Sequence, residues 1–136
     1  MSVPKNERKE NKLEVINCAE ELAAYSFAMC KSEDRFPKRD RWLLAAPIVQ
    51  TVMKILVNIK KANYIRVESK SSKEKRYSLQ EDALNATFEI LAYLEIAYNM
   101  KYIGGKSLGY WTGLVEKTRS ILSCWMKSDK DRYKDI

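Results

Sequence analysis

Apolar residues recur at spacings of three and four along most of this chain. This is the pattern of helices that each bury one face, and no stretch of useful length alternates apolar and polar residues as a β-strand would. A first helix is predicted over residues 11–31, because the segment after it leads to Pro37 and the residue before a proline disfavours helical geometry. Its expected buried positions are Leu13, Ile16, Ala19 or Glu20, Ala23, Phe27 and Cys30, with Leu22 and Met29 widening the face.

A second helix is predicted from about residue 38 to residue 64 or 66, with Pro37 in its first turn. Pro47 falls inside this segment, where a proline removes one backbone hydrogen bond and clashes with the carbonyl group of Leu43. Two helices are the alternative here, but because the apolar pattern continues across Pro47, we expect one bent helix. Its expected buried positions are Trp42, Ala46, Val49, Met53 and Leu56, with Leu44, Ile48, Ile55 and Ile59 extending the face.

The polar, serine-rich segment 68–77 is predicted to be a loop. Ser78 and Glu81 form a capping-box signature, so the third helix is expected to begin there and to end at Gly104. The fourth helix is expected to begin near Ser107. The expected buried positions are Leu84, Phe88, Leu91, Leu94 or Glu95, and Tyr98 in the third helix, and Leu108, Trp111, Val115, Thr118, Leu122 and Trp125 in the fourth.

Four long helices joined by mostly short connections indicate an all-α fold, an antiparallel up-down four-helix bundle. The connection between the second and third helices is expected to be the longest. A chain of 136 residues is the size of one ordinary domain. The bundle is predicted over residues 11–128, between a flexible N-terminal tail (1–10) and a polar C-terminal tail (129–136).

The net charge of +7 is concentrated in one stretch. Between Lys54 and Arg76 there are eight basic residues and only two acidic ones, Glu68 and Glu74. A surface of this kind attracts polyanions, which predicts contact with RNA or DNA phosphates without base specificity. The alternative is that part of the cluster neutralises the C-terminus of a helix and that the rest is solvated.

No arrangement of residues indicates catalysis. The chain has no histidine, which excludes Ser-His-Asp triads, Cys–His pairs and histidine-based zinc sites. The segment Gly105-Lys106-Ser107 is similar to the end of a phosphate-binding loop, but Met100 stands where that motif requires glycine, and the segment follows a helix. We therefore expect no enzymatic activity, no cofactor and no metal site.

The three cysteines, Cys18, Cys30 and Cys124, lie within helical patterns and are expected to be buried free thiols in a reducing cytosol. The N-terminus has no apolar signal core, and no stretch is expected to reach the roughly 20 apolar residues of a membrane span. These features predict a cytoplasmic protein with no membrane association.

The aromatic residues have two interpretations. Trp42, Trp111 and Trp125 lie on apolar stripes and are expected in the core. Four tyrosines lie near predicted helix ends, where a ring either covers the core with its hydroxyl in water or stacks on an unpaired base. They are Tyr64, Tyr77, Tyr110 and Tyr133.

Short motifs at the second and fourth helices resemble a known family. Phe36-Pro37-Lys38-x-x-Arg41, Ser107-Leu108-Gly109-Tyr110-Trp111 and Ile121-Leu122-Ser123-Cys124-Trp125-Met126-Lys127-Ser128 carry the resemblance. The family comprises small four-helix bundle proteins encoded in ribosomal RNA intervening sequences, together with the accessory variability determinant proteins of diversity-generating retroelements. In the latter the last helix ends in a Gly-Gly-Trp-x-Lys-Ser type motif, and here Ser123-Cys124 replaces the small pair.

The resemblance implies a non-catalytic accessory protein that forms a homopentamer, binds the retroelement's reverse transcriptase and its template RNA, and supports mutagenic cDNA synthesis. By charge and region, it implies nucleic-acid contact, with RNA or DNA phosphates, at a set of basic residues. These are Lys60, Lys61, Arg66, Lys70, Lys73, Lys75 and Arg76. The alternative is a protein–protein adaptor of the ribosomal intervening-sequence type, without a retroelement role.

Overall fold

The structure is a computed structural model that describes the backbone of residues 5–136 and the side chains of residues 14–136. Within this range the chain is helical and contains no strand, which confirms the all-α prediction. The long helices are α1 (Lys5–Lys31), α2 (Ala46–Tyr64), α3 (Lys70–Asn99) and α4 (Gly105–Arg132). Two short helical turns, η1 (Lys38–Asp40) and η2 (Arg41–Ala45), lead into α2.

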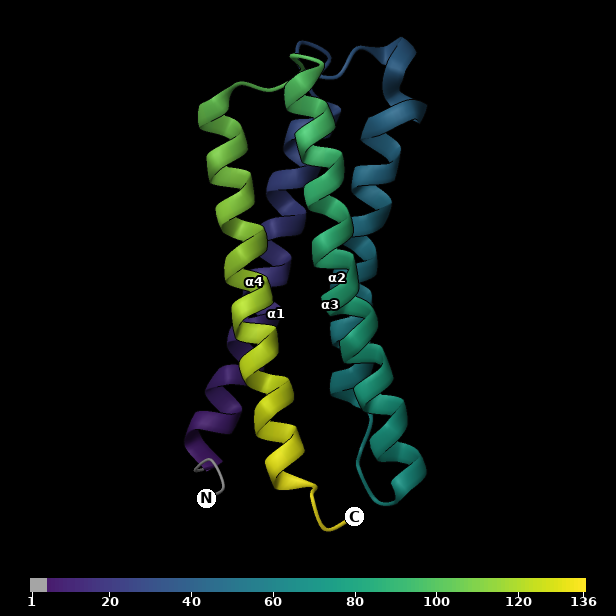
Figure 1. Ribbon diagram of the computed structural model, residues 1–136, viewed down its shortest axis with the longest axis vertical. Coiled ribbons are helices and arrows are strands. Elements are labelled where there is room, and N and C mark those ends of the chain that lie inside the picture. The colour runs from purple at the N-terminus through teal and green to yellow at the C-terminus, as the bar shows by residue number, and fades with distance from the viewer. Residues whose placement is uncertain (1–4) are drawn as a thin grey trace.

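Each long helix packs against two others: α1 and α3 both contact α2 and α4. The four helices lie side by side along the long axis of the molecule (Figure 1). The start of α1, the C-terminus and the α2–α3 connection lie at one end of the bundle, which we call the terminal end. The other two connections lie at the opposite end. Segments that are far apart in the sequence therefore meet at the terminal end.

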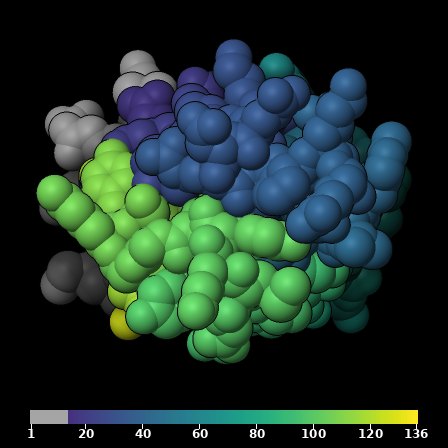
Figure 2. Space-filling view, turned by 90° about the horizontal axis from the view of Figure 1, so that it is seen from above, coloured from purple at the N-terminus to yellow at the C-terminus, as the bar shows by residue number. Residues whose placement is uncertain are grey.

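The opposite end is covered by the connections α1–α2 and α3–α4, which lie side by side there (Figure 2). The Tyr102 hydroxyl donates a hydrogen bond to Asp40 Oδ2 at 2.6 Å. The rings of Phe36 and Tyr102 pack with their centroids 5.6 Å apart. The hydrogen bond to Asp40 raises the pKa of Tyr102, because the carboxylate stabilises the protonated phenol. These contacts tie the two connections together.

The predicted seam of α4 is confirmed. Trp111, Val115, Thr118, Leu122 and Trp125 are all buried, and Leu108 is half-buried. The buried indole group of Trp111 on this seam finds a partner. Trp111 Nε1 donates to Ser26 Oγ at 2.8 Å, and Ser26 Oγ donates to the Leu22 carbonyl oxygen at 2.7 Å. These bonds satisfy the indole N–H and join α1 to α4 inside the core.

The face of α3 that meets the core includes Leu94, as expected, but also several alanines that were not predicted to be buried. Ala83, Ala86, Ile90, Leu94 and Ala97 are buried, whereas the expected core residues Phe88 and Tyr98 are 54% and 46% exposed. Small side chains allow the backbones of two helices to approach closely, so alanines can occupy the core face. In α1, Phe27 was also expected in the core, but it is 43% exposed.

The helical backbone continues from residue 38 to residue 64, as expected, and the irregularity near Pro47 is the π-turn η2 directly before it. Pro47 is the second residue of α2, directly after η2, and its missing N–H removes one hydrogen bond to the preceding turn. The preceding turn η2 is a π-helix, in which the Ala46 N–H donates to the carbonyl group of Arg41. A π-turn contains more residues than an α-turn. The side chains before it therefore point in other directions than they would in a continuous α-helix. Trp42 is consequently 81% exposed and outside the core, while Ile48, Ile55 and Ile59 are fully buried.

The expectation that no segment reaches the length and composition of a membrane span is also wrong. Within residues 5–136, one segment, Lys38–Tyr64, does so, with a mean hydropathy of 1.6 over 18 residues. A core helix of a bundle passes the same test, and the buried isoleucines of α2 account for much of its apolar character.

The thiols differ in exposure, and this gives a direct test of the packing. Cys18 and Cys30 are buried as expected, but Cys124 is exposed. Burial raises the pKa of Cys30 to about 12, so this thiol stays protonated and unreactive at mildly alkaline pH. We expect a thiol reagent to modify one cysteine rapidly in the native protein and all three after denaturation. A Cys124→Ser variant that still shows a rapidly reacting thiol would contradict this packing.

Candidate nucleic-acid interface

The seven basic residues selected from the sequence lie at the terminal end, six of them on helices and one in a connection. Lys60 and Lys61 are near the end of α2, and Arg66 is in the five-residue connection 65–69. The segment predicted as a loop forms the first turns of α3, so that prediction is wrong, and so is the expectation that this connection is the longest. The first turns of α3 carry the remaining members, Lys70, Lys73, Lys75 and Arg76.

Two serines explain where α3 begins. Ser69 Oγ accepts from the Ser72 N–H at 3.2 Å, and Ser72 Oγ accepts from the Ser69 N–H at 3.0 Å. This reciprocal capping satisfies donors that would otherwise have no partner at a helix start. The capping box predicted at Ser78 and Glu81 is therefore wrong, because Ser78 lies well inside α3.

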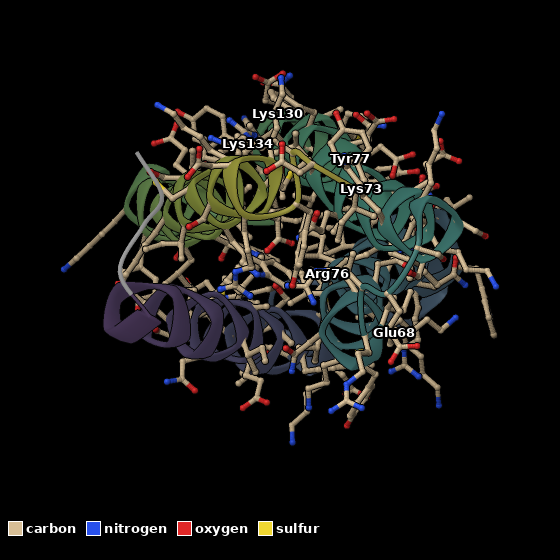
Figure 3. All side chains as sticks on the ribbon, turned by 90° about the horizontal axis from the view of Figure 1, so that it is seen from below. Glu68, Lys73, Arg76, Tyr77, Lys130 and Lys134 are labelled. Atoms are coloured by element: carbon tan, nitrogen blue, oxygen red, sulfur yellow. The ribbon has the colours of Figure 1, made fainter. Side chains whose placement is uncertain are left out.

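Arg76 is not on the surface. Its side chain lies between the helices, whereas Lys130 lies at the outer edge of the bundle (Figure 3). Arg76 Nε and Nη2 donate to the two carboxylate oxygens of Asp129 at 2.7 and 3.0 Å. Gln80 Nε2 donates to Asp129 Oδ2 at 2.8 Å, and Arg76 Nη1 donates to the Ile65 carbonyl oxygen at 3.1 Å. Arg76 is therefore engaged in holding α3, α4 and the α2–α3 connection together.

Aromatic rings complete the surroundings of this ion pair. The Arg76 guanidinium carbon lies 5.1 Å from the centroid of the Trp125 ring and 5.8 Å from that of Tyr133. Both distances allow a favourable cation–π interaction. Pairing, hydrogen bonding and stacking together offset the cost of burying this arginine between the helices.

Asp129 and Gln80 are the residues that the sequence analysis missed. Asp129 was assigned to a polar tail, but α4 continues to Arg132 and buries it. Leu122, Trp125 and Asp129 are at spacings of three and four, so Asp129 continues the seam of α4. It was not predicted to be buried because the seam was assigned from its apolar residues. Arg76 and Gln80 are four residues apart, which places them on one face of α3.

Five of the seven selected basic residues remain available for phosphate contact, and we call them the basic interface: Lys61, Arg66, Lys70, Lys73 and Lys75. All are exposed except Lys73, which is half-buried. Lys60 is close to an acidic partner, since its Nζ lies 3.1 Å from Glu20 Oε1, and both groups are partly exposed. Two carboxylates, Glu68 and Glu74, lie within the same stretch of sequence, so the basic interface has a net positive charge.

Three of the four tyrosines near helix ends, Tyr64, Tyr77 and Tyr110, are at least half exposed, and two of them lie at the terminal end. Tyr110 packs against Tyr25, with ring centroids 4.8 Å apart, and Tyr133 lies against Arg76. Tyr64 and Tyr77 are 82% and 50% exposed, and both lie at the terminal end. Tyr77 lines a mainly apolar cavity of about 320 Å³ together with Lys73 and Lys130. These two rings are the ones placed where a base could stack.

Among the side chains of residues 14–136, no group of three or more Cys, Asp or Glu residues could hold a metal ion. No protein-family model, no curated protein and no solved structure matches this chain. Function is therefore inferred from the residues and their geometry, and the family resemblance stays a prediction.

The buried ion pair gives a stability prediction. Replacing Asp129 by Asn removes the charge while keeping the size, and leaves the Arg76 guanidinium buried without a counter-ion. We expect a loss of about 3–5 kcal/mol in the free energy of unfolding. The matched control, Glu20→Gln, breaks the exposed pair with Lys60 and should cost less than about 1 kcal/mol. Equal effects of the two variants in denaturant titrations would contradict the role of this pair.

Proposed function

We propose that this protein is a non-catalytic accessory subunit that binds nucleic acid through its phosphates. The observation that carries the proposal is the basic interface on the ends of two packed helices. Phosphate contacts need cations at fixed positions and supply affinity without reading bases. Lysines held by helices lose less conformational freedom on binding than lysines on a loop.

The first turn of α3 supports this proposal because its charges oppose its own stability. It holds Lys70 and Lys73 and no acidic residue. The positive end of the helix dipole lies there, so cations are unfavourable by about 0.3–1 kcal/mol each. A purely structural reason for these lysines is therefore weak. Lys61, in the last turn of α2, is favourable for the dipole and gives no such argument.

From the four long helices and their short connections, we further propose an antiparallel up-down bundle. From the family resemblance, we propose that it assembles into a homopentamer and assists a retroelement reverse transcriptase in mutagenic cDNA synthesis. Exposed apolar residues support the idea of association: Trp42 is 81% exposed and Leu43 is 77% exposed. Large exposed apolar side chains are costly in a monomer and are typical of contact surfaces. In a ring, repeated copies of the basic interface would contact several phosphates at once, and these weak contacts together would raise the affinity.

The second candidate function is a protein–protein adaptor. The same two exposed side chains favour it, since aromatic and aliphatic anchors dominate many protein interfaces. Beside them is a mainly apolar cavity of about 400 Å³, lined in part by Phe27, Ala46 and Val49. In this alternative the basic interface is a solvated surface and contributes nothing to the activity.

Salt dependence separates the two candidates. We expect the protein to bind single-stranded RNA with an affinity that falls steeply as salt rises. Replacing Lys70, Lys73 and Lys75 together by Gln should lower the slope of log affinity against log salt by about two, at about 0.7 for each lost phosphate contact. Titration of a labelled RNA at several salt concentrations measures this slope.

The matched control carries Gln at Lys31, Lys106 and Lys117, which are exposed lysines away from the basic interface. Because the change in net charge is the same, the control should keep the slope of the original protein. Equal losses in both triple variants, or no RNA binding at low salt, would contradict the proposal.

A further inference from the structure

A polar cavity of about 340 Å³ opens at the terminal end, between the α2–α3 connection and the end of α4. Its volume lies within the range of about 300–1,000 Å³ typical of small-ligand sites. Unlike the neighbouring cavity beside Tyr77, its lining is almost entirely polar. Its lining includes Asn63, Tyr64, Arg66, Arg76, Arg132 and Tyr133.

Three of these residues are arginines, and no carboxylate side chain lines the cavity. Arg76 is already neutralised by Asp129. Among the described side chains, Arg66 and Arg132 lie within ion-pair distance of no carboxylate. Two guanidinium groups without a counter-ion therefore line one polar cavity, and their positive charge favours the binding of an anion there.

Helix dipoles do not help an anion here. Both α2 and α4 end at this cavity, and the C-terminus of a helix carries partial negative charge. Attraction of an anion must therefore come from the guanidinium groups. Arginine suits phosphate in particular, because its planar fork of N–H donors matches two phosphate oxygens.

We propose that this cavity binds the terminal phosphate of a nucleic-acid strand. A terminal phosphate monoester carries a charge of about −1.5 to −2 at neutral pH, which matches the two free guanidinium groups. An internal phosphodiester carries a single charge and is flanked by sugars on both sides. The assignment deepens the proposed function and rests on it, since it places the end of the bound strand.

The neighbouring rings fit the same ligand. Tyr64 lines the cavity and is 82% exposed, so its face is free to stack on the terminal base. Tyr133 is held between two arginines, with Arg132 Nη1 donating to its hydroxyl at 3.2 Å and Arg76 5.8 Å from its ring centroid. The strand would continue from the cavity toward Lys70 and Lys73, at the start of α3.

A structural role for Arg132 is the competing explanation, because cations in the last turn of a helix satisfy its dipole. Lys130 lies in the same last turn and is exposed, but it does not line this cavity. An Arg132→Ala variant and a Lys130→Ala variant therefore lose the same charge near the same helix end. Only the first loses a contact to this polar cavity.

The test compares two single-stranded RNAs of one sequence with an internal label, one with phosphates at both ends and one with hydroxyls at both ends. We expect the original protein to bind the phosphorylated strand about tenfold more tightly, the effect of one charge-assisted contact. This preference should disappear in Arg132→Ala, return in part in Arg132→Lys, and persist in Lys130→Ala.

Each other outcome has a defined meaning. Equal binding of the two RNAs by the original protein would overturn the assignment of the cavity and leave the basic interface intact. Equal loss of the preference in Arg132→Ala and Lys130→Ala would also overturn it. A nucleoside 5′-monophosphate provides a separate probe: if neither RNA binds but this probe raises the Tm of the original protein and not that of Arg132→Ala, the phosphate site stands and the proposed function fails.

Discussion

The buried ion pair between Arg76 and Asp129 is the interaction on which the terminal end of this bundle depends. One residue comes from the start of α3 and the other from the end of α4. Helix ends usually fray, because their last backbone groups have no intrahelical partner. Here the pair also engages Gln80 and the backbone of Ile65, so one charged contact fixes two helix ends and the connection between α2 and α3.

The position of the surface cations follows from this buried contact. With Arg76 held inward, Lys73 and Lys75 are carried on an ordered helix. The same guanidinium group lines the polar cavity near Arg66 and Arg132. Arg76 is thus a structural charge inside the bundle, whereas the neighbouring lysines lie at its surface. Sequence composition alone cannot make this distinction, because all of these residues count equally toward the net charge.

How much of the fold the sequence could predict depends on the size of the packed residues and on how far apart in the sequence the contacting residues are. The α4 seam was predictable because large residues such as Trp111 and Leu122 repeat without a break. The start of α3 was not, since the serine-rich segment is typical of loops and the stabilising residue, Asp129, is far along the chain. Trp42 was misplaced because a π-turn changes the helical phase, and periodicity assumes a constant phase. The cluster of cations was found from composition, but the burial of Arg76 required the tertiary structure.

Amide hydrogen exchange across residues 65–80 tests the central claim most directly. In the structure the Lys73 N–H donates to the Ser69 carbonyl oxygen at 3.0 Å, and regular helix follows. We predict protection from Lys73 onward in the native protein, with selective loss of that protection when the Arg76–Asp129 pair is removed. Exchange through Tyr77 at the rate of an unfolded loop would contradict the account, because the cations would then lie on a disordered segment rather than on a held helix.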